Sequence, residues 1–161
     1  MPDPEDSANR YVERMGTALA DAGLQRLPSR VFAALTVDDD GRMTSAELVA
    51  ALDVSPASVS GAVQYLSRIG FLHRERERGS RRDVYVVDDD AWLQAMLREE
   101  QVYGPMIAAL DTALRDLPAG APARRRLRLM REFLTFVGEE MEGIADRWLA
   151  RRAELEAEGL D

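Results

Sequence analysis

Five arginines lie within residues 74–82, and they are the side chains in this sequence with the clearest capacity for chemistry. Guanidinium groups stay charged at physiological pH and bind phosphate in a bidentate manner. Residues 55–83 carry six Arg and three acidic residues, a net charge of +3, inside a chain of 161 residues whose net charge is −8. Because the local field decides where a polyanion docks, the sequence predicts polyanion binding along this stretch.

The chain has few of the residue types that catalytic or redox chemistry requires. The chain has no Cys and no Lys, and His73 is its single histidine. These counts exclude disulfides, thiolate zinc sites, cysteine nucleophiles and Schiff-base lysines, and no nucleophile–base pair stands out. We therefore expect no enzyme activity, no cofactor and no metal, and we expect His73 to be an ordinary strand residue.

Residues 36–47 partly match a calcium-binding loop. Asp38, Asp40, Gly41 and Glu47 occupy positions three, five, six and twelve of the loop. Thr36, at position one, supplies no carboxylate, and the chain has no second copy of the loop. The alternative is an acidic turn followed by a capping box from Thr44 to Glu47, which starts a helix, and it accounts for these residues better.

Hydrophobic spacing and turn residues predict a mainly helical chain with one hairpin. Helices are expected over about 5–22, 28–37, 44–52 and 55–70. Strands are expected over 71–78 and 83–87, joined at Gly79-Ser80. A further helix follows Asp88–Asp90 with a kink at Gly104-Pro105, and after the loop at 118–122 the last helix runs over about 123–158.

The helix at 55–70 has the features of a DNA-recognition helix. Ser55 and Pro56 favour its start and Gly70 its end. Its outward face has no carboxylate and consists of Ala57, Ser58, Ser60, Gly61, Gln64, Tyr65 and Arg68. Small residues allow a helix to approach base edges in the major groove, and arginines at a hairpin tip suit a narrow minor groove. The alternative is an ordinary helical corner followed by a solvated Arg/Glu strand.

Four segments together resemble the MarR-type winged-helix regulators, and most closely their GbsR-like branch. They are Met43-Thr-Ser-Ala-Glu-Leu48, Val54-Ser-Pro-Ala-Ser-Val-Ser60, Leu66-Ser-Arg-Ile-Gly-Phe-Leu72 and Gly79-Ser-Arg-Arg-Asp-Val-Tyr85, followed by Asp90-Ala-Trp92. The resemblance implies a homodimer, held by its first and last helices, on an inverted-repeat operator. It also implies that Ser58, Ser60, Gly61, Gln64 and Tyr65 lie near bases and that Arg81 or Arg82 contacts DNA from the wing. To these DNA contacts we add Ser55, Ala57, Arg68 and Arg78 as expectations. Many relatives have a basic residue where this chain has Gly61.

The last helix carries an apolar seam with alternating spacings of four and three residues. Its members are Met130, Leu134, Val137, Met141, Ile144 and Trp148. Such a seam is typical of helices that pair, and we expect it both to fold back on the preceding helix and to form a dimer interface. Five arginines within 124–131 either pair with acids of a neighbouring helix, which we favour, or make a second nucleic-acid contact.

A second set of large apolar side chains has two interpretations. Tyr11, Met15, Trp92, Met96, Tyr103 and Met106 either line a pocket for a small-molecule effector or belong to the ordinary core, which is the commoner role of such residues.

The sequence thus predicts a winged helix-turn-helix with long N- and C-terminal dimerisation helices. The expected divisions are 1–27 for dimerisation, 28–88 for DNA binding and 89–161 for dimerisation.

No apolar run is long enough to span a membrane and the start is acidic, so we expect a cytoplasmic protein. The expected function is a homodimeric regulator, more specifically a repressor, that binds double-stranded DNA and that a small molecule releases. The alternative is a winged-helix protein-interaction module. Operator, regulated genes and effector stay open.

Overall fold

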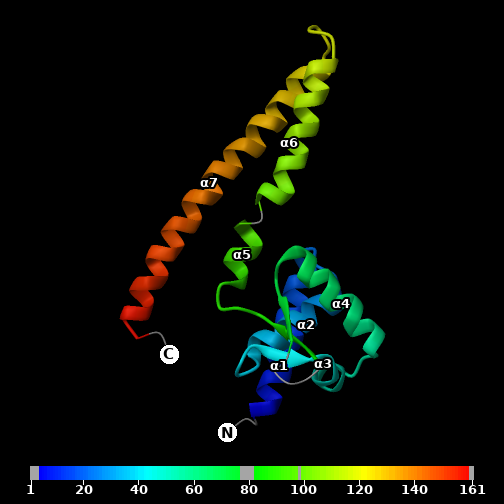
Figure 1. Ribbon diagram of the computed structural model, residues 1–161, viewed down its shortest axis with the longest axis vertical. Coiled ribbons are helices and arrows are strands. Elements are labelled where there is room, and N and C mark those ends of the chain that lie inside the picture. Colours follow the sequence, from blue (N-terminus) through cyan, green and yellow to red (C-terminus); the bar gives the residue numbers. More distant parts are fainter. Residues whose placement is uncertain (1–3, 77–81, 98, 160–161) are drawn as a thin grey trace. The chain divides into compact units, whose positions relative to one another are not determined.

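The computed structural model describes residues 4–76, 82–97 and 99–159 (Figure 1). The chain divides into two compact units, Met1–Ala95 and Met96–Asp161. As the sequence predicts, the described part is mainly helical with one small antiparallel sheet.

The first unit combines helices with a three-stranded sheet. Its helices are α1 (Pro4–Asp21), α2 (Arg26–Val37), α3 (Ser45–Leu52), α4 (Pro56–Ile69) and most of α5 (Ala91–Leu97). Its strands are β1 (Arg42–Thr44), β2 (His73–Arg76) and β3 (Asp83–Val86), in the order β1-β3-β2 with both pairs antiparallel. Strand β3 is therefore central, and its neighbours form the edges.

Helix α2 is the centre of the core of this unit. Residues 31–35 are all buried, and Phe32 and Leu35 are among the largest side chains without exposure. The rings of Phe32, Phe71 and Trp92 meet edge to face, with centroids 4.9–5.3 Å apart. Edge-to-face pairs of this kind add stability beyond the area that they bury. The cluster ties α2 to the segment before β2 and to the start of α5.

Local capping signals place the ends of α3 and α4 where the sequence predicts them. Ser55 caps α4 by accepting a hydrogen bond from the Ser58 backbone N–H at 3.2 Å, and Pro56 follows in the first turn. Gly70 ends α4 with a φ of 85°, a left-handed conformation that costs glycine little. Two short helices are thereby fixed in length by residues within a few positions of their ends.

The capping box of α3 allows a test of local stability. The Thr44 hydroxyl accepts from the Glu47 N–H at 3.3 Å, and the Glu47 carboxylate accepts from the Thr44 N–H at 2.6 Å. We expect Thr44→Ala to lower the free energy of unfolding by about 1 kcal/mol in urea denaturation. Ser45→Ala, at the next position, is the control and should change it little.

The same box has a defined pH dependence. The hydrogen bonds from Thr44 lower the pKa of Glu47 below 4.5. A carboxylate with a lowered pKa stabilises the fold above its ordinary pKa, and this contribution is lost as pH falls through the lowered value. The difference between wild type and Thr44→Ala should therefore shrink in acid. An unchanged difference would mean that the Glu47 carboxylate plays no part in it.

Two features of the first unit differ from the sequence-based expectations. Strand β1 is not among the expected elements; it exists because its backbone pairs with β3, with Met43 opposite Tyr85. Strand β2 begins at His73 rather than at residue 71, and β3 ends at Val86 rather than at residue 87; Arg78 and Arg81 lie outside the described residues. The expected helix after Asp90 corresponds to α5 and α6 (Glu99–Asp116), which lie on either side of Arg98, a residue outside the described ranges, and α6 continues through Gly104-Pro105.

The second unit is a helical hairpin. Helix α6 and helix α7 (Ala123–Ala157) lie side by side, joined by the loop at 117–122 (Figure 1). They have 18 and 35 residues, so α7 is longer by about 25 Å at 1.5 Å per residue. Helix α6 is therefore too short to cover the C-terminal half of α7.

Within the described ranges, no single helix is long and apolar enough to cross a membrane. Helices α3 and α4 meet such a criterion only when they are taken together, and that pair is bent by 111°.

Candidate nucleic-acid interface

Helices α3 and α4 form a helix-turn-helix. Their bend of 111° lies within the range of about 90–120° that is typical of this motif. The tight connection is made by Asp53, which adopts a left-handed conformation with a φ of 52° and donates its N–H to the Val49 carbonyl. The turn therefore places α4 across α3 rather than in line with it.

The outward face of α4 is small, polar and mostly exposed. Ser55, Ala57, Ser58, Ser60, Gly61, Gln64 and Arg68 are all exposed, as the sequence predicts. Tyr65 differs because it is half-buried and packs against the core. The inward face consists of Val59, Ala62, Val63 and Leu66, all buried. Burial of one face holds the other toward solvent, where a major groove could receive it.

Two of the predicted DNA contacts already have a structural role. The Ser55 hydroxyl caps α4, and it also lies 2.8 Å from the Ser58 hydroxyl. Gln64 and Arg68 lie one turn apart further along α4. These long side chains are therefore better placed than the two serines to reach base edges or phosphates.

A hollow of about 470 Å³ separates α4 from the sheet. Gln64 and Arg68 line it from α4, and Arg74 and Tyr85 line it from β2 and β3. Arg74 donates to the Asp83 carboxylate on the neighbouring strand, which raises the pKa of the Arg74 guanidinium. The hollow thus brings an arginine of the recognition helix and an arginine of the wing to one surface.

The opposite face of β2 holds a polar cluster that the sequence did not indicate. Glu75 accepts from Arg42 on β1 at 2.5 Å and lies 3.1 Å from the ring of His73, and these two partners lower its pKa. His73 also lies 3.0 Å from Asp88. The predicted solvated alternation of 74–77 is therefore only partly right, because Glu75 is half-buried and paired. The partner Arg42 is distant in sequence, so no local pattern could have shown it.

Arg82 is the wing-tip arginine that the structure describes. Its side chain is exposed, and its charge helps to lower the pKa of Glu47 at the start of α3. Arg78 and Arg81, also predicted to contact DNA, lie outside the described residues.

Gly61 allows a test of close approach at α4. A Cβ added there would meet nothing within 4 Å, so Ala fits. Alanine favours a helix interior by about 1 kcal/mol over glycine. We expect Gly61→Ala to raise the melting temperature by a few degrees while weakening DNA binding measured by fluorescence anisotropy. Higher stability with unchanged DNA affinity would show that DNA does not approach the helix backbone here.

The six residues predicted to line an effector pocket fall in both units. In the first unit, the Tyr11 hydroxyl lies 3.0 Å from that of Thr36, Met15 packs against the core, and Trp92 belongs to the aromatic cluster. In the second unit, Tyr103 is half-buried and Met106 is 39% exposed. Met96 also belongs to the second unit.

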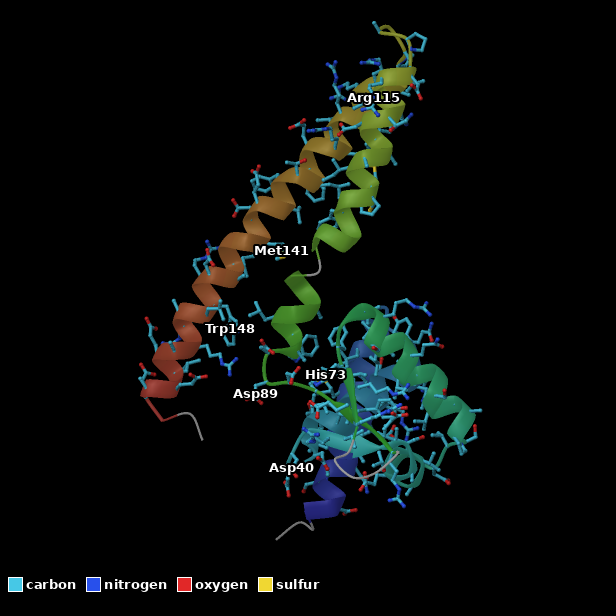
Figure 2. The ribbon with its side chains drawn as sticks, in the orientation of Figure 1. Asp40, His73, Asp89, Arg115, Met141 and Trp148 are labelled. Carbon is cyan, nitrogen blue, oxygen red and sulfur yellow. The ribbon has the colours of Figure 1, made fainter. Side chains whose placement is uncertain are left out.

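The apolar residues of α7 fall on two faces. Leu134 of the predicted seam is buried, Val137 and Met141 are half-buried, and Met130, Ile144 and Trp148 are exposed; Met141 and Trp148 are labelled in Figure 2. Four large side chains outside the seam are more exposed still: Leu129 at 56%, Phe133 at 63%, Phe136 at 58% and Leu149 at 50%. We call Leu129, Met130, Phe133 and Phe136 the α7 apolar face. The 3.5-residue repeat selected only Met130 of these four residues, because the repeat follows a single stripe along the helix.

The arginines at the start of α7 serve partly to join α6 to α7. Arg124 donates to the backbone carbonyls of Leu114 and Leu117 at the C-terminal end of α6. Arg131 pairs with Asp111 of α6 at 2.6 Å, which raises the pKa of its guanidinium. The favoured expectation, pairing with an acid of the neighbouring helix, is thus met by Arg131. Arg124 instead satisfies free carbonyls at a helix end, where a cation is favourable.

A helix-turn-helix followed by a β-wing defines the winged-helix class of DNA-binding proteins. Two family models match the chain: the MarR family over residues 22–83 and the MmpR5-like MarR family transcriptional regulators over residues 90–152. Together they cover the winged helix and most of the second unit. Both models describe MarR-type regulators, so the chain is similar to the MarR family of transcriptional regulators over most of its length, and this similarity indicates a regulator rather than an enzyme.

Individual proteins are also similar to this chain. The chain is 29% identical over 151 residues to the HTH-type transcriptional regulator MmpR5 of Mycobacterium tuberculosis, covering 93% of this chain and 92% of that protein. A crystal structure of a transcriptional regulator superposes with a TM-score of 0.80 at 28% identity, covering 89% of this chain and 99% of that one. Bordetella bronchiseptica BpsR, whose DNA binding is regulated by 6-hydroxynicotinic acid, is 21% identical over 77% of this chain and 84% of that one, with a TM-score of 0.41.

Proposed function

We propose that this chain is a sequence-specific repressor that binds an inverted-repeat operator as a homodimer in the cytoplasm. The observation that carries the proposal is the exposed, carboxylate-free face of α4, which is held at 111° to α3 and shares a hollow with Arg74 of the wing strand β2. Two recognition helices about 34 Å apart would enter successive major grooves. A ligand that binds the two arrangements of the dimer unequally would release the operator.

The proposed dimer uses the ends of the chain, in keeping with a division into 1–27, 28–88 and 89–161. The α7 apolar face supports it, because contiguous exposed apolar side chains mark interaction surfaces. The exposed seam residues Ile144 and Trp148 would extend the contact along the C-terminal half of α7, which α6 is too short to cover. Placement in the GbsR-like branch rests on the wing pattern Gly-x-Arg-Arg-x-x-Tyr at 79–85, whereas the second unit matches the MmpR5-like model.

The test is selection of genomic DNA fragments by the purified protein at two salt concentrations. We expect enrichment of a pseudo-palindrome with half-sites about one helical turn apart, with affinity that falls steeply as salt rises. The genes next to the enriched sites would suggest the effector. Weak binding without sequence preference, which disappears at moderate salt, would favour the protein-interaction module instead.

The wing is tested separately by Arg81→Ala together with Arg82→Ala. Removing two guanidinium groups from the minor groove should abolish operator binding in anisotropy titrations at physiological salt, while size-exclusion chromatography still shows the wild-type assembly. Arg14→Ala, which removes an exposed arginine of α1, is the control for the loss of one positive charge outside the wing. Operator affinity that survives the double change would mean that the wing does not touch DNA.

A further inference from the structure

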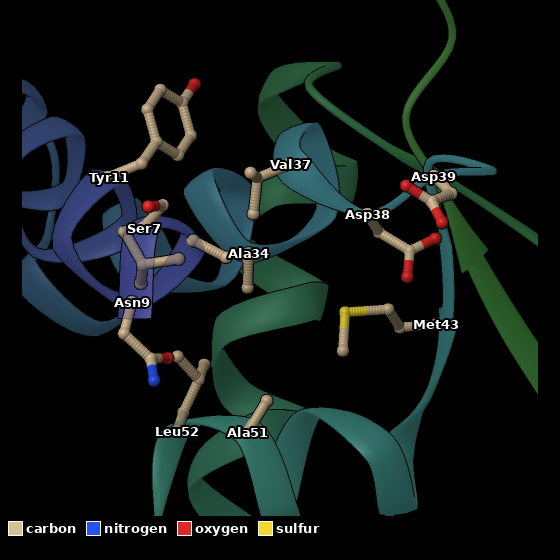
Figure 3. A pocket seen from close by; sticks show the side chains of 12 residues that line it. Ser7, Asn9, Tyr11, Ala34, Val37, Asp38, Asp39, Met43, Ala51 and Leu52 are labelled. Atoms are coloured by element: carbon tan, nitrogen blue, oxygen red, sulfur yellow. The ribbon is translucent and has the colours of Figure 1, made fainter. Parts of the chain in front are cut away.

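A cavity of about 680 Å³ opens in the first unit between α1, α2, β1 and α3 (Figure 3). Most of its wall is apolar, with contributions from Val12, Ala34, Val37, Met43 and Leu52. Its volume lies within the range of about 300–1,000 Å³ that is common for small-molecule sites. Of the six residues that the sequence suggests for an effector pocket, Tyr11 lines this cavity.

The charged side chains that line this cavity are both carboxylates, and the other polar side chains, Ser7, Asn9 and Tyr11, are neutral. Asp38 and Asp39 lie together at one end and Tyr11 at the other (Figure 3), and the described lining includes no Arg and no His. Three arginines of the same elements pair with acids: Arg10 with Asp6, Arg30 with Glu13 and Arg42 with Glu75. An apolar wall that ends in two carboxylates is complementary to an apolar molecule with a positive head group.

The two carboxylates differ in how firmly they are held. Asp38 Oδ1 accepts from the backbone N–H groups of Asp40 at 3.2 Å and Arg42 at 3.1 Å, so the turn orients its second oxygen. In Figure 3 the Asp38 carboxylate points toward the side of the cavity where Met43 lies. The side chain of Asp39 is exposed beside it. A cation entering the cavity would therefore meet one pre-oriented carboxylate and one adaptable carboxylate.

We propose that this cavity binds a small organic cation, an amine on an alkyl or aromatic body, with the ammonium at Asp38 and Asp39 and the body against Val37 and Leu52. The walls include Ala51 and Leu52 of α3 and Met43 of β1, which pairs with the wing strand β3. A bound amine would thus contact α3, the helix that the turn connects to α4. The regulatory part of this inference rests on the proposed function, whereas binding itself does not.

The binding test uses decylammonium chloride below its micellar concentration, in isothermal titration calorimetry with the full-length protein at pH 7. Sodium decanoate and decanol, of equal chain length, are the matched probes for charge. We expect decylammonium to bind one per chain and decanoate to bind about tenfold more weakly or worse, because its charge has the sign of the two carboxylates. Equal binding of the three probes would overturn the assignment of a cation site.

Four variants test whether decylammonium binds in this cavity. Ala51→Trp should block the cavity, whereas Ala50→Trp adds the same ring at a neighbouring position of α3 that does not line it. Asp39→Asn should weaken decylammonium binding about two- to fivefold, as for an exposed ion pair. Asp40→Asn removes the same formal charge from the same turn outside the cavity and should change it little. Undiminished binding in Ala51→Trp would place the amine elsewhere and overturn the proposal.

A separate anisotropy titration with operator DNA distinguishes this inference from the proposed function. Binding of the amine with the expected variant pattern, but no DNA binding, would refute the proposed function and leave the site standing. Operator binding with no amine binding would refute only the site. If both bind, decylammonium should change operator affinity in wild type and not in Ala51→Trp; an unchanged affinity would overturn the regulatory part.

Discussion

A protein carrying Phe133→Glu and Phe136→Glu should be monomeric in sedimentation and bind the full operator about 10²–10⁴-fold more weakly, because its two DNA-binding units are no longer linked. Both side chains are more than half exposed, so the introduced carboxylates disturb no packing within the hairpin. In the proposed dimer, by contrast, four carboxylates would be forced together in a desolvated apolar interface, which is strongly unfavourable.

Two controls separate assembly from folding and from charge. Phe133→Leu with Phe136→Leu keeps the α7 apolar face and should leave the protein dimeric. Affinity for a single half-site on a short duplex should stay close to wild type in the Glu variant, since α7 is not the proposed DNA-binding helix. A Glu variant that sediments as a dimer would show that the subunits associate through another surface.

Gln64→Ala together with Arg68→Ala should reduce operator affinity by about 10²–10⁴-fold, since each base or phosphate contact of this kind contributes roughly 1–3 kcal/mol. Both side chains lie on the exposed face of α4, so the melting temperature should hardly change. The two single variants should have different effects on DNA binding. Gln64→Ala should relax preference at one base-pair position, because a glutamine amide pairs with adenine.

Arg68→Ala should reveal which DNA group the Arg68 guanidinium binds. If it binds a phosphate, the variant should bind all sequences equally more weakly, and the slope of log affinity against log salt should fall by about 1. If it binds a base, most of that slope should remain and a second base-pair position should relax. Competition titrations with single-base operator variants at three salt concentrations measure both quantities. Wild-type affinity in the double variant would mean that α4 is not the recognition helix.

Features that depend on a few neighbouring residues were predictable in this chain. Ser55, Pro56 and Gly70 set the ends of α4, and Thr44 with Glu47 set the start of α3, because each cap is a hydrogen bond or backbone preference within about four residues. The period of buried side chains then placed the outward face of α4 correctly, except for Tyr65, which is half-buried. The class of fold followed from the order of these elements.

Features made by distant partners needed the tertiary structure. Strand β1 has three residues and pairs with β3 about forty positions away, so no propensity could indicate it. Leu134 is buried while Phe133 beside it is exposed. The heptad pattern selected Leu134 because it has the spacing of a seam, and it does not say which face α6 already covers.

The local interactions encoded in the sequence thus settle where helices begin, where they end and which face of α4 is polar. Folding decides which of those polar groups share a surface, because hydrogen bonds and ion pairs such as Arg42 with Glu75 join residues that no pattern connects. The cavity at Asp38 and Asp39 is of this second kind: four elements wall it, and each supplies only a few side chains. Burial and charge complementarity in three dimensions, rather than spacing, make it a site.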